Sequence, residues 1–536
     1  MSAAPPLFSS PSARAVLRAP HPGRIAAIAL GAIYAFALAS LLTTADKPTP
    51  SALISPYLQR ILWSSLLQAS LSTLMSLMLG AALALALARM TIATSAMRAL
   101  VLTMTVAPTI VIVLGVVTVY GRSGWAAELA SAFGATEWPS IYGLSGILIA
   151  HVAMNAPFAA RVFLNALNDA PAEHHRIAAL AGFDARRIFI HCDWPALKAE
   201  LPGLATLIML LCFTSFAVVI TLGGGPANAT LEVAIYEALR VEVDFGRAAL
   251  LAILQVVIMG AVTALARRAI GREPAAWGSG LIMRRADRAM TSMRVVDAAA
   301  ISIFLIALAP ILLAPLSGGL ALVSLADLDV ARALVTSLLV AAPAALLCVL
   351  LAVLLASGAV ARMEADPAAR QSFPIAPLLA LAVPPFALIA GLYGPLRRFG
   401  DNAALAMILV PFVNGLMALP FAYRLIEPPL RQSHSRYRRL AAHLRISGLD
   451  RLRIVDWPLL RRPLFAAFVM AFALSLGDFG VAALFSGQDF RTLPLLLNER
   501  MGAYRLAEAQ AIALLMIALA FIAALTTERF AHAGDR

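Results

Sequence analysis

About twelve long apolar runs constrain this chain more than any other feature of its sequence. Each is long enough to cross the hydrocarbon core of a bilayer as a helix, which takes about 20 residues. Closed β-barrels, the other structure that can span a membrane, alternate apolar and polar residues, and these runs do not. The sequence therefore predicts an all-α membrane protein with about 12 transmembrane helices. The runs lie near residues 25–44, 61–88, 99–120, 144–165, 204–222, 247–266, 295–317, 331–356, 375–395, 403–425, 465–485 and 508–527.

The composition agrees with a chain that lies largely in lipid. Of its 536 residues, 61% are hydrophobic and 13% are charged, whereas about a quarter of the residues of a soluble domain are charged. The net charge of +13 could indicate nucleic-acid binding. The arginines, however, lie in short loops between apolar runs, so we expect the lipid bilayer and no nucleic acid as a partner. Cys192, Cys212 and Cys348 are far apart in sequence, which predicts neither a metal site nor a disulfide framework.

The distribution of charge between the runs predicts the orientation of the chain. Loops rich in arginine follow the second, fourth, sixth and tenth runs, whereas the alternate loops carry more Asp and Glu. The positive-inside rule places the basic loops and both termini in the cytoplasm. The first run is long enough to span the membrane, so we interpret it as an uncleaved anchor rather than a signal peptide.

An internal repeat divides the chain into two halves. The shift between the copies is 263 residues, as from position 157 to position 420. Both copies of the repeated loop are cytoplasmic in the predicted orientation, which indicates a parallel repeat of two six-helix units. The repeated segments are Pro157-Phe158-Ala159-Ala160-Arg161 with Pro420-Phe421-Ala422-Tyr423-Arg424, and Asp193-Trp194-Pro195 with Asp456-Trp457-Pro458. The predicted organisation is a cytoplasmic tail (1–24), a first unit (25–266), a cytoplasmic linker (267–294), a second unit (295–527) and a cytoplasmic tail (528–536).

The two repeated cytoplasmic loops are the best candidates for a functional surface. An Ala-Ala pair gives each loop a small face that another surface can approach closely, and apolar residues such as Phe183 and Ile446 could anchor in a partner's pocket. The alternative is an amphipathic segment that lies on anionic lipid. The candidate residues are Arg176, Ala178, Ala179, Gly182, Phe183, Trp194 and Pro195 in the first loop, and Arg439, Ala441, Ala442, Arg445, Ile446, Trp457 and Pro458 in the second.

The spacing in these loops resembles the EAA motif of binding-protein-dependent ABC importer permeases. That motif runs Glu-Ala-Ala, three residues, Gly, nine residues, and then an apolar residue, any residue, Leu and Pro. In the family, the loop forms a short cytoplasmic helix that docks on the ATP-binding subunit. The match is imperfect, because Arg176 and Arg439 replace the Glu, Arg445 replaces the second Gly, and tryptophan replaces the Leu in both copies.

A phosphate-binding P-loop requires Gly-Lys followed by Ser or Thr. Lys47 precedes Pro48 and Lys198 precedes Ala199, so neither lysine fits this motif. We therefore expect a transport subunit that is not itself an enzyme and binds no cofactor. The ATP would be used by a partner.

Further segments narrow the resemblance to the thiamine and thiamine pyrophosphate transport permeases, and they extend over nearly the whole chain. The resemblance implies two tandem ABC type I importer permease units in the bacterial inner membrane. It also implies two copies of a cytoplasmic ABC ATPase, a periplasmic thiamine-binding protein, and import of thiamine and its phosphates. Ferric-iron permeases of the same fused format are the alternative, and an ion-coupled secondary transporter is a more remote one. The segments are 120–125, 215–226 with Gly-Gly-Gly-Pro, 235–239, and 475–494 with Asp-Phe-Arg-Thr-Leu-Pro.

An ionisable residue inside an apolar run is the best pointer to a substrate pathway, because burying it in a membrane costs several kcal/mol. Asp478 is such a residue, and a carboxylate would suit the positive thiazolium ring of thiamine, to which aromatic faces can also bind. The repeat pairs Phe216 with Phe479, so both halves could contribute to one central site. The alternative is that Asp478 caps a helix break between two glycines. The pathway candidates are Phe213, Ser215, Phe216, Ser475, Asp478 and Phe479.

Overall fold

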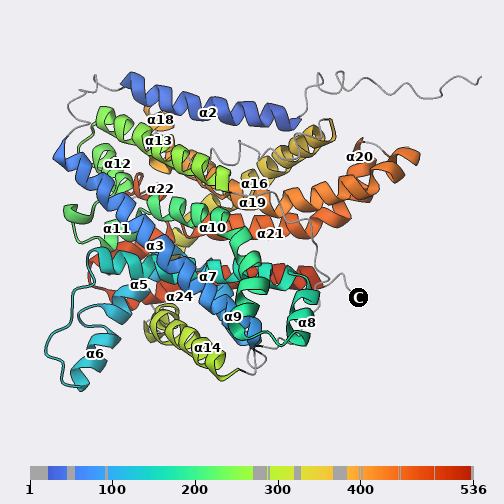
Figure 1. The fold of residues 1–536 in the computed structure, drawn as a ribbon. Coiled ribbons are helices and arrows are strands. Elements are labelled where there is room, and N and C mark those ends of the chain that lie inside the picture. The colour runs from blue at the N-terminus through green and yellow to red at the C-terminus, as the bar shows by residue number, and fades with distance from the viewer. Residues whose placement is uncertain are drawn as a thin grey trace, which may run out of the picture.

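Helices make up most of the described part of this chain (Figure 1), and the described residues contain no strand. In the computed structural model, 11 helices are long and apolar enough to cross a membrane, and Ala96–Thr105 and Pro385–Leu396 are shorter apolar helices. The prediction of an all-α membrane protein with about 12 such helices is therefore confirmed. The structure describes residues 22–44, 55–90, 94–269, 287, 290–318, 327–365, 383–396, 399, 402–444, 446, 448–487 and 489–532. Most of the predicted tail 1–24, most of the linker 267–294 and the first part of the run 375–395 lie outside them.

The described helices fall into two series with a similar order. The first series is α2 (Pro22–Thr44), α3 (Pro56–Arg89), α4 (Thr94–Val106), α5 (Thr109–Tyr120), α6 (Trp125–Ala132), α7 (Leu144–Asp169), α8 (Ala172–Leu180), α9 (Ala185–Ile188), a π-helical turn (Phe189–Asp193), α10 (Trp194–Phe213), α11 (Ala217–Leu222), a 3-10 turn (Pro226–Asn228), α12 (Leu231–Arg240) and α13 (Phe245–Ala269). The second is α14 (Thr291–Ile303), a π-helical turn (Phe304–Leu308), α15 (Ala309–Leu313), α16 (Leu328–Ala365), α18 (Pro385–Leu396), α19 (Asn402–His443), α20 (Gly448–Arg451), a π-helical turn (Leu452–Asp456), α21 (Trp457–Leu476), α22 (Gly480–Ala483), α23 (Leu493–Gly502) and α24 (Leu506–His532).

Three of the predicted runs are interrupted. The run 99–120 breaks before Pro108, because proline lacks an amide hydrogen and disfavours a helical residue before it. The runs 204–222 and 465–485 break at corresponding places, between α10 and α11 and between α21 and α22. At the second of these breaks, the Asp478 amide donates to the carbonyl of Ser475 at 3.2 Å. Such irregular backbone is tolerated at membrane depth only where protein or a water-filled cavity surrounds it.

A buried serine makes the same hydrogen bond in each half. The Ser65 hydroxyl on α3 accepts a hydrogen bond from the Leu231 amide at the start of α12, at 2.9 Å. The Ser337 hydroxyl on α16 accepts one from the Leu493 amide at the start of α23, at 2.8 Å. In both halves the serine satisfies an amide that the first turn of the helix leaves without a partner. This recurrence is what a tandem repeat predicts.

The first helix of each half packs against the other half. α2 packs on α16 and α18 of the second half, while α14 and α15 pack on α3 and α5 of the first. Glycines allow the close approach in both places. A Cβ atom would lie 2.1 Å from the Ile311 carbonyl oxygen if placed at Gly115 on α5, and 2.1 Å from the Ala37 carbonyl oxygen if placed at Gly391 on α18. The two halves therefore interlock instead of meeting at a flat interface.

A buried ion-pair cluster also joins the halves at the end of α3. Arg89 Nε lies 2.8 Å from Asp287 Oδ2, and Arg89 Nη1 lies 2.7 Å from Asp297 Oδ1 on α14. Both Arg89 and Asp287 are buried. Removing one member of such a cluster would leave a buried charge without compensation, which usually costs about 3–5 kcal/mol. Arg89 thus fixes α14 and the described part of the linker to the first half.

Replacing the glycines of the interlock should destabilise the fold. Gly115→Ala and Gly391→Ala each place a methyl group against a backbone carbonyl, and overpacking of this kind costs about 1–3 kcal/mol. We expect a lower thermal unfolding midpoint for each variant in detergent. Gly203→Ala on α10 is the control, because no atom lies within 4 Å of the added Cβ. Unchanged midpoints in both interlock variants would contradict the close packing.

Candidate coupling segments and central aromatic cluster

The first coupling segment, residues 170–195, folds into a compact unit after α7. At the end of α8, the Phe183 amide donates to the Ala178 carbonyl at 3.0 Å. Gly182 has a φ of +64°, the left-handed conformation that glycine adopts where a helix ends. The Asp184 side chain then caps α9 by accepting a hydrogen bond from the Arg187 amide at 2.9 Å. The glycine of the first loop, Gly182, thus has a structural reason to occupy this position.

A small buried cluster holds this segment together. Ala178 on α8, Ile188 on α9 and Cys192 in the π-helical turn form it, and Phe183 packs against them. One of the two predicted alanines therefore faces the inside of the segment, whereas Ala179 is exposed. A polar contact adds to this packing, since His175 Nε2 on α8 lies 3.5 Å from the buried Asp193 Oδ1.

The opposite face of this segment is apolar and exposed. Ile177 is 62% exposed and Leu180 is 90% exposed. Trp194 and Pro195, at the start of α10, are also exposed, and so is Arg176. Single exposed apolar residues are common, but several on one short helix next to a tryptophan mark a surface for interaction.

The second coupling segment, residues 433–458, differs from the first where it begins, whereas the short helix and π-helical turn that follow correspond in both. α19 continues without interruption from the membrane to His443, whereas the first half has a break at Ala170 and Pro171. The Ile446 amide donates to the carbonyl of the buried Ala441 at 2.9 Å. Arg439 and Ala442 lie on the last turns of α19, and Arg445 lies outside the described residues.

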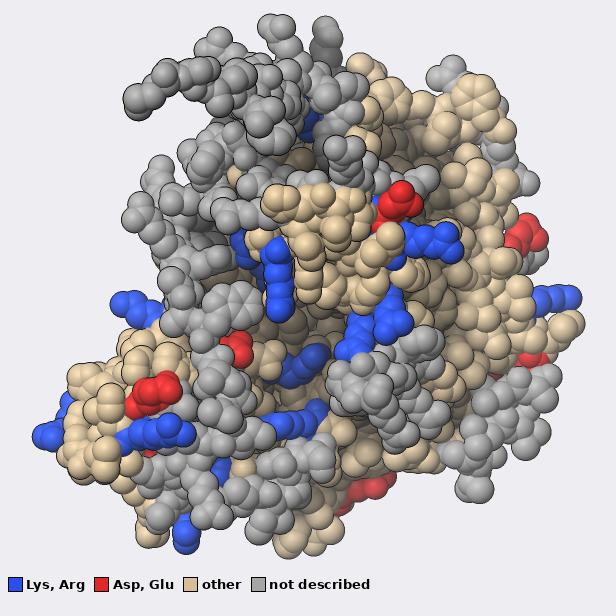
Figure 2. Space-filling view, turned by 90° about the vertical axis from the view of Figure 1, so that its right-hand side faces the viewer, with Lys and Arg blue, Asp and Glu red and all other residues tan. Residues whose placement is uncertain are grey.

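The exposed apolar positions of the two segments correspond. Leu440, which the repeat pairs with Ile177, is 55% exposed, and Trp457, which it pairs with Trp194, is exposed as well. Pro458 follows Trp457 on the surface of α21. Figure 1 shows α8 and α9 on the same side of the molecule as α20, so both segments are presented at one end of the helices. Figure 2 views this side and shows Lys and Arg around and inside a hollow.

The aspartates of the repeated Asp-Trp-Pro motif hold the segments in place, a role that our sequence analysis missed. Asp193 contacts His175, and Asp456 Oδ1 accepts a hydrogen bond from the Ser433 hydroxyl at 2.6 Å. Both aspartates are buried. The signal that could have revealed this role is the aspartate that recurs immediately before Trp-Pro in both copies. A carboxylate at that position can reach back to the preceding helix.

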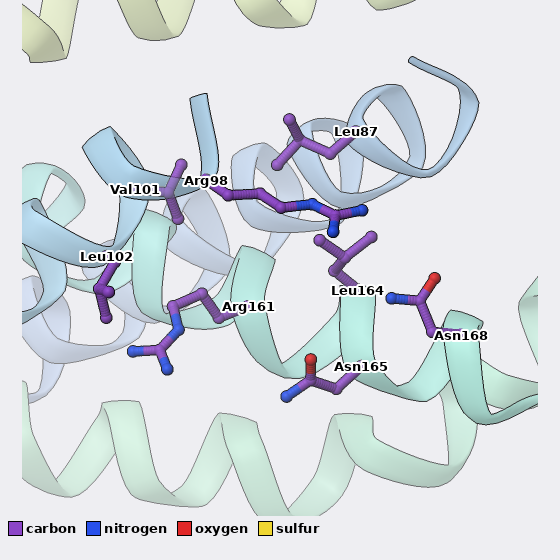
Figure 3. A pocket seen from close by; sticks show the side chains of 8 residues that line it. All are labelled: Leu87, Arg98, Val101, Leu102, Arg161, Leu164, Asn165 and Asn168. Carbon is purple, nitrogen blue, oxygen red and sulfur yellow. The ribbon is translucent and has the colours of Figure 1, made fainter. Parts of the chain in front are cut away.

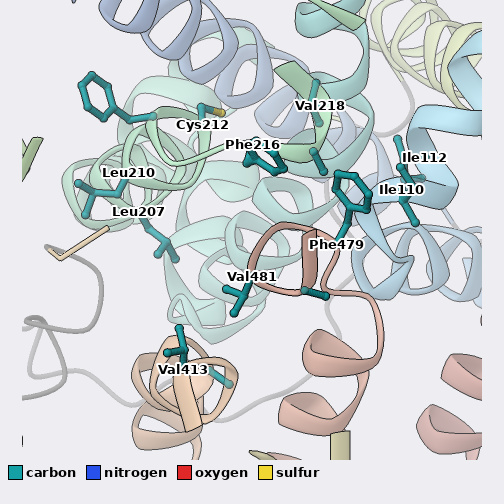
Figure 4. Packing of buried hydrophobic residues seen from close by; sticks show 14 of the residues in the cluster. Ile110, Ile112, Leu207, Leu210, Cys212, Phe216, Val218, Val413, Phe479 and Val481 are labelled. Atoms are coloured by element: carbon teal, nitrogen blue, oxygen red, sulfur yellow. The ribbon is translucent and has the colours of Figure 1, made fainter. Parts of the chain in front are cut away.

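Aromatic side chains from both halves meet between the broken helices. Phe216 and Phe479 stack with their ring centroids 5.8 Å apart and their planes 15° apart (Figure 4). Phe386 from α18 and Tyr236 from α12 each lie 4.7 Å from the Phe216 ring. Phe216, Phe386 and Phe479 are buried. The pairing of Phe216 with Phe479 agrees with the repeat, while Tyr236 and Phe386 were not among the predicted residues.

Asp478 lies beside this cluster, at the start of α22. The backbone amides of Gly480, Val481 and Ala482 and the side chain of Asn414 interact with its carboxylate, as in a helix cap. Its Oδ2 atom is buried and has no hydrogen-bond partner among the described residues. The geometry thus contains a cap together with a buried carboxylate oxygen that no described residue hydrogen-bonds.

The remaining pathway candidates are spread around the cluster. Ser475 accepts a hydrogen bond from Asn414 Nδ2 at 3.0 Å, and both residues are buried. Ser215 is half-buried at the break before α11. Phe213 is buried in α10 and makes no ring contact with another described residue. Asn414 was missed, because a single asparagine inside an apolar run usually makes only a hydrogen bond between helices.

Seven curated proteins that are similar to this chain over most of its length share one description. The thiamine transport system permease protein ThiP of Escherichia coli (strain K12) is 38% identical over 475 residues, covering 87% of this chain and 88% of the relative. ThiP of Brucella melitensis biotype 1 is 39% identical over 429 residues, covering 79% and 78%. ThiP of Haemophilus influenzae is 35% identical over 468 residues, covering 86% and 87%. No protein-family model matches the chain. The chain belongs to the thiamine transport permease family.

Membership in the thiamine transport permease family settles the class of protein. It confirms the prediction of an ABC importer permease and makes the chain a multi-pass transport subunit rather than an enzyme. The fused ferric-iron permease, our alternative from the sequence, is not favoured by these relatives. The roles of the coupling and pathway residues remain predictions.

The contact of Asp193 with α8 yields a prediction about the first coupling segment. Asp193→Ala should loosen α8, because it removes the buried carboxylate that His175 contacts at 3.5 Å. Trypsin cleavage after Arg186 and Arg187 should then increase about fivefold or more, which corresponds to a loss of about 1 kcal/mol. The cleavage products can be quantified by mass spectrometry. Asp169→Ala is the control, because this exposed aspartate at the end of α7 has no partner among the described residues. Equal cleavage of both variants would show that Asp193 does not hold the segment.

Proposed function

We propose that this chain is the membrane-spanning permease of a bacterial ABC importer that carries thiamine and its phosphates into the cytoplasm. The observation that carries the proposal is the 38% identity to a thiamine permease over 87% of this chain and 88% of the relative. ATP would be hydrolysed by a separate subunit. A periplasmic binding protein would deliver the thiamine.

The two coupling segments support the proposal of two ATPase subunits. Each presents an exposed apolar residue on its helix, Ile177 or Leu440, and an exposed tryptophan at the start of the next helix. A few residues that become buried when the partner binds, tryptophan above all, dominate the binding energy of protein interfaces. Arginines such as Arg176 would steer acidic groups of the partner. Because both segments lie at the same end of the molecule, two partner subunits could bind side by side there.

The central aromatic cluster supports a pathway between the two halves. Phe216 and Phe479 come from the breaks in equivalent helices and stack on each other, so they close the space between the halves in this conformation. Separation of the halves would expose the two ring faces to a passing cation, to which aromatic rings bind. The Oδ2 atom of Asp478 would add a negative group on the same path.

Uptake of labelled thiamine is the direct test of this function. Cells that lack their own thiamine importer should accumulate thiamine when they produce this chain with its ATPase and binding protein, and ferric iron should not accumulate. A double variant, Ile177→Asp with Leu440→Asp, should reduce uptake at least about tenfold, because it places charges in two apolar contact sites.

Two controls make the uptake result specific. Ile177→Met with Leu440→Met keeps apolar anchors of similar size, so it should retain uptake. Iron uptake without thiamine uptake would reject thiamine as the substrate. Thiamine uptake that persists without the ATPase would reject the assignment to the ABC importers. Full uptake by the Asp double variant would reject the coupling role of Ile177 and Leu440, and it would leave the importer function unchallenged.

The pathway role of Asp478 can be separated from its role as a cap. Asp478→Asn keeps an oxygen acceptor for the amides of α22 but removes the negative charge. If the charge attracts thiamine, uptake should fall at least about tenfold while ATP hydrolysis and the thermal unfolding midpoint are retained. Normal uptake would reject the pathway role and leave the cap. Ser215→Ala, at the paired position of the first half, should lower uptake less because no charge is lost.

A further inference from the structure

Four polar side chains line a pocket at the end of α7, and none has a partner among the described residues. Arg98 comes from α4, while Arg161, Asn165 and Asn168 come from α7. None of the four makes a hydrogen bond or an ion pair with another described residue. In Figure 3, Arg98 extends across the pocket towards Leu164, and Arg161 and Asn165 lie on its lower side.

The remaining wall of this pocket is apolar. Leu87, Val101, Leu102 and Leu164 line it, and the cavity has a volume of about 190 Å³. A wall of this kind excludes water from one side, which strengthens the electrostatic interactions of the guanidinium groups. The pocket therefore combines two positive charges and two amide donors with a surface of lower dielectric constant.

The charge in this pocket is not balanced. No acidic residue lines it. A second pocket in the described part of the chain, by contrast, combines Arg122 with Glu128 and Glu137. The repeat pairs Arg161 with Arg424, and Arg424 has an acidic neighbour, Glu200, within electrostatic reach. The excess positive charge around Arg161 is therefore particular to this pocket, and it is not a general property of the repeated Pro-Phe-Ala-x-Arg segment.

We propose that this pocket binds a phosphate group, carried either by a phospholipid headgroup or by a small soluble phosphate. Guanidinium groups bind phosphate oxygens with two parallel hydrogen bonds, and the two asparagine amides can donate further ones. Basic pockets between transmembrane helices are known binding sites for anionic lipid headgroups. The pocket includes Asn165 and Asn168 near the end of α7, and α8 follows this end in the chain. An occupant would contact α3, α4 and α7 together.

This proposal does not rest on thiamine transport, so it can be tested by binding alone. The purified full-length chain in detergent is titrated with radiolabelled inorganic phosphate. In parallel, native mass spectrometry compares retention of phosphatidylglycerol with that of a diacylglycerol that has the same acyl chains but no phosphate. We expect the wild type to bind inorganic phosphate, or to retain phosphatidylglycerol in preference to diacylglycerol. Binding of inorganic phosphate would identify a small soluble phosphate as the occupant. Preferential retention of phosphatidylglycerol would identify a lipid headgroup.

Variants of the pocket decide whether the binding occurs there. Arg98→Gln and Arg161→Gln should each weaken the binding at least about tenfold, and Asn165→Asp, which adds a negative charge at an exposed position, should do the same. Arg122→Gln, in the pocket with mixed charges, is the matched control and should bind like the wild type. The proposal is overturned if neither phosphate ligand binds, if diacylglycerol is retained equally well, or if the three pocket variants bind like the control.

Discussion

Close packing of each half's first helix against the other half is the constraint on which the rest of this structure depends. Gly115 and Gly391 let α5 and α18 approach the backbone of those helices, and Arg89 fixes α14 through a buried ion pair. In lipid there is little hydrophobic force between helices, so small residues and polar contacts must supply the association. The breaks that follow α10 and α21 lie in the interior, where Phe213, Phe216 and Phe479 are buried.

These interior breaks create the centre of the molecule. A continuous helix would have presented only side chains to the middle of the bundle. Each break instead turns the chain, so that Phe216 and Phe479 point towards each other from equivalent positions. The same turn brings Asp478 to the start of a short helix, where backbone amides can meet its carboxylate. The aromatic stack and the carboxylate are therefore consequences of one backbone feature that occurs in both halves.

The sequence was sufficient for those features that depend on period and repetition. Run length predicted the helices, and one fixed shift predicted that Phe216 and Phe479 correspond. Contacts between distant segments were not accessible in this way. Nothing in a single sequence indicates that α18 lies against α2, so the contribution of Phe386 to the aromatic cluster could not be predicted. The buried roles of Asp193 and Asp456 were missed for a related reason, since a charged residue in a cytoplasmic loop normally faces solvent.

The exchange of first helices also has a consequence for the order of events during synthesis. α2 is made before α16 and α18, and its buried stripe of Leu30, Tyr34, Ala37 and Leu41 faces helices that include these two. Those helices begin at residues 328 and 385, so about 300 further residues must leave the ribosome before the stripe meets them. At about 5–20 residues per second, that interval is on the order of 15–60 seconds. Until then, lipid, α13 or the insertion machinery must cover this face of the first helix.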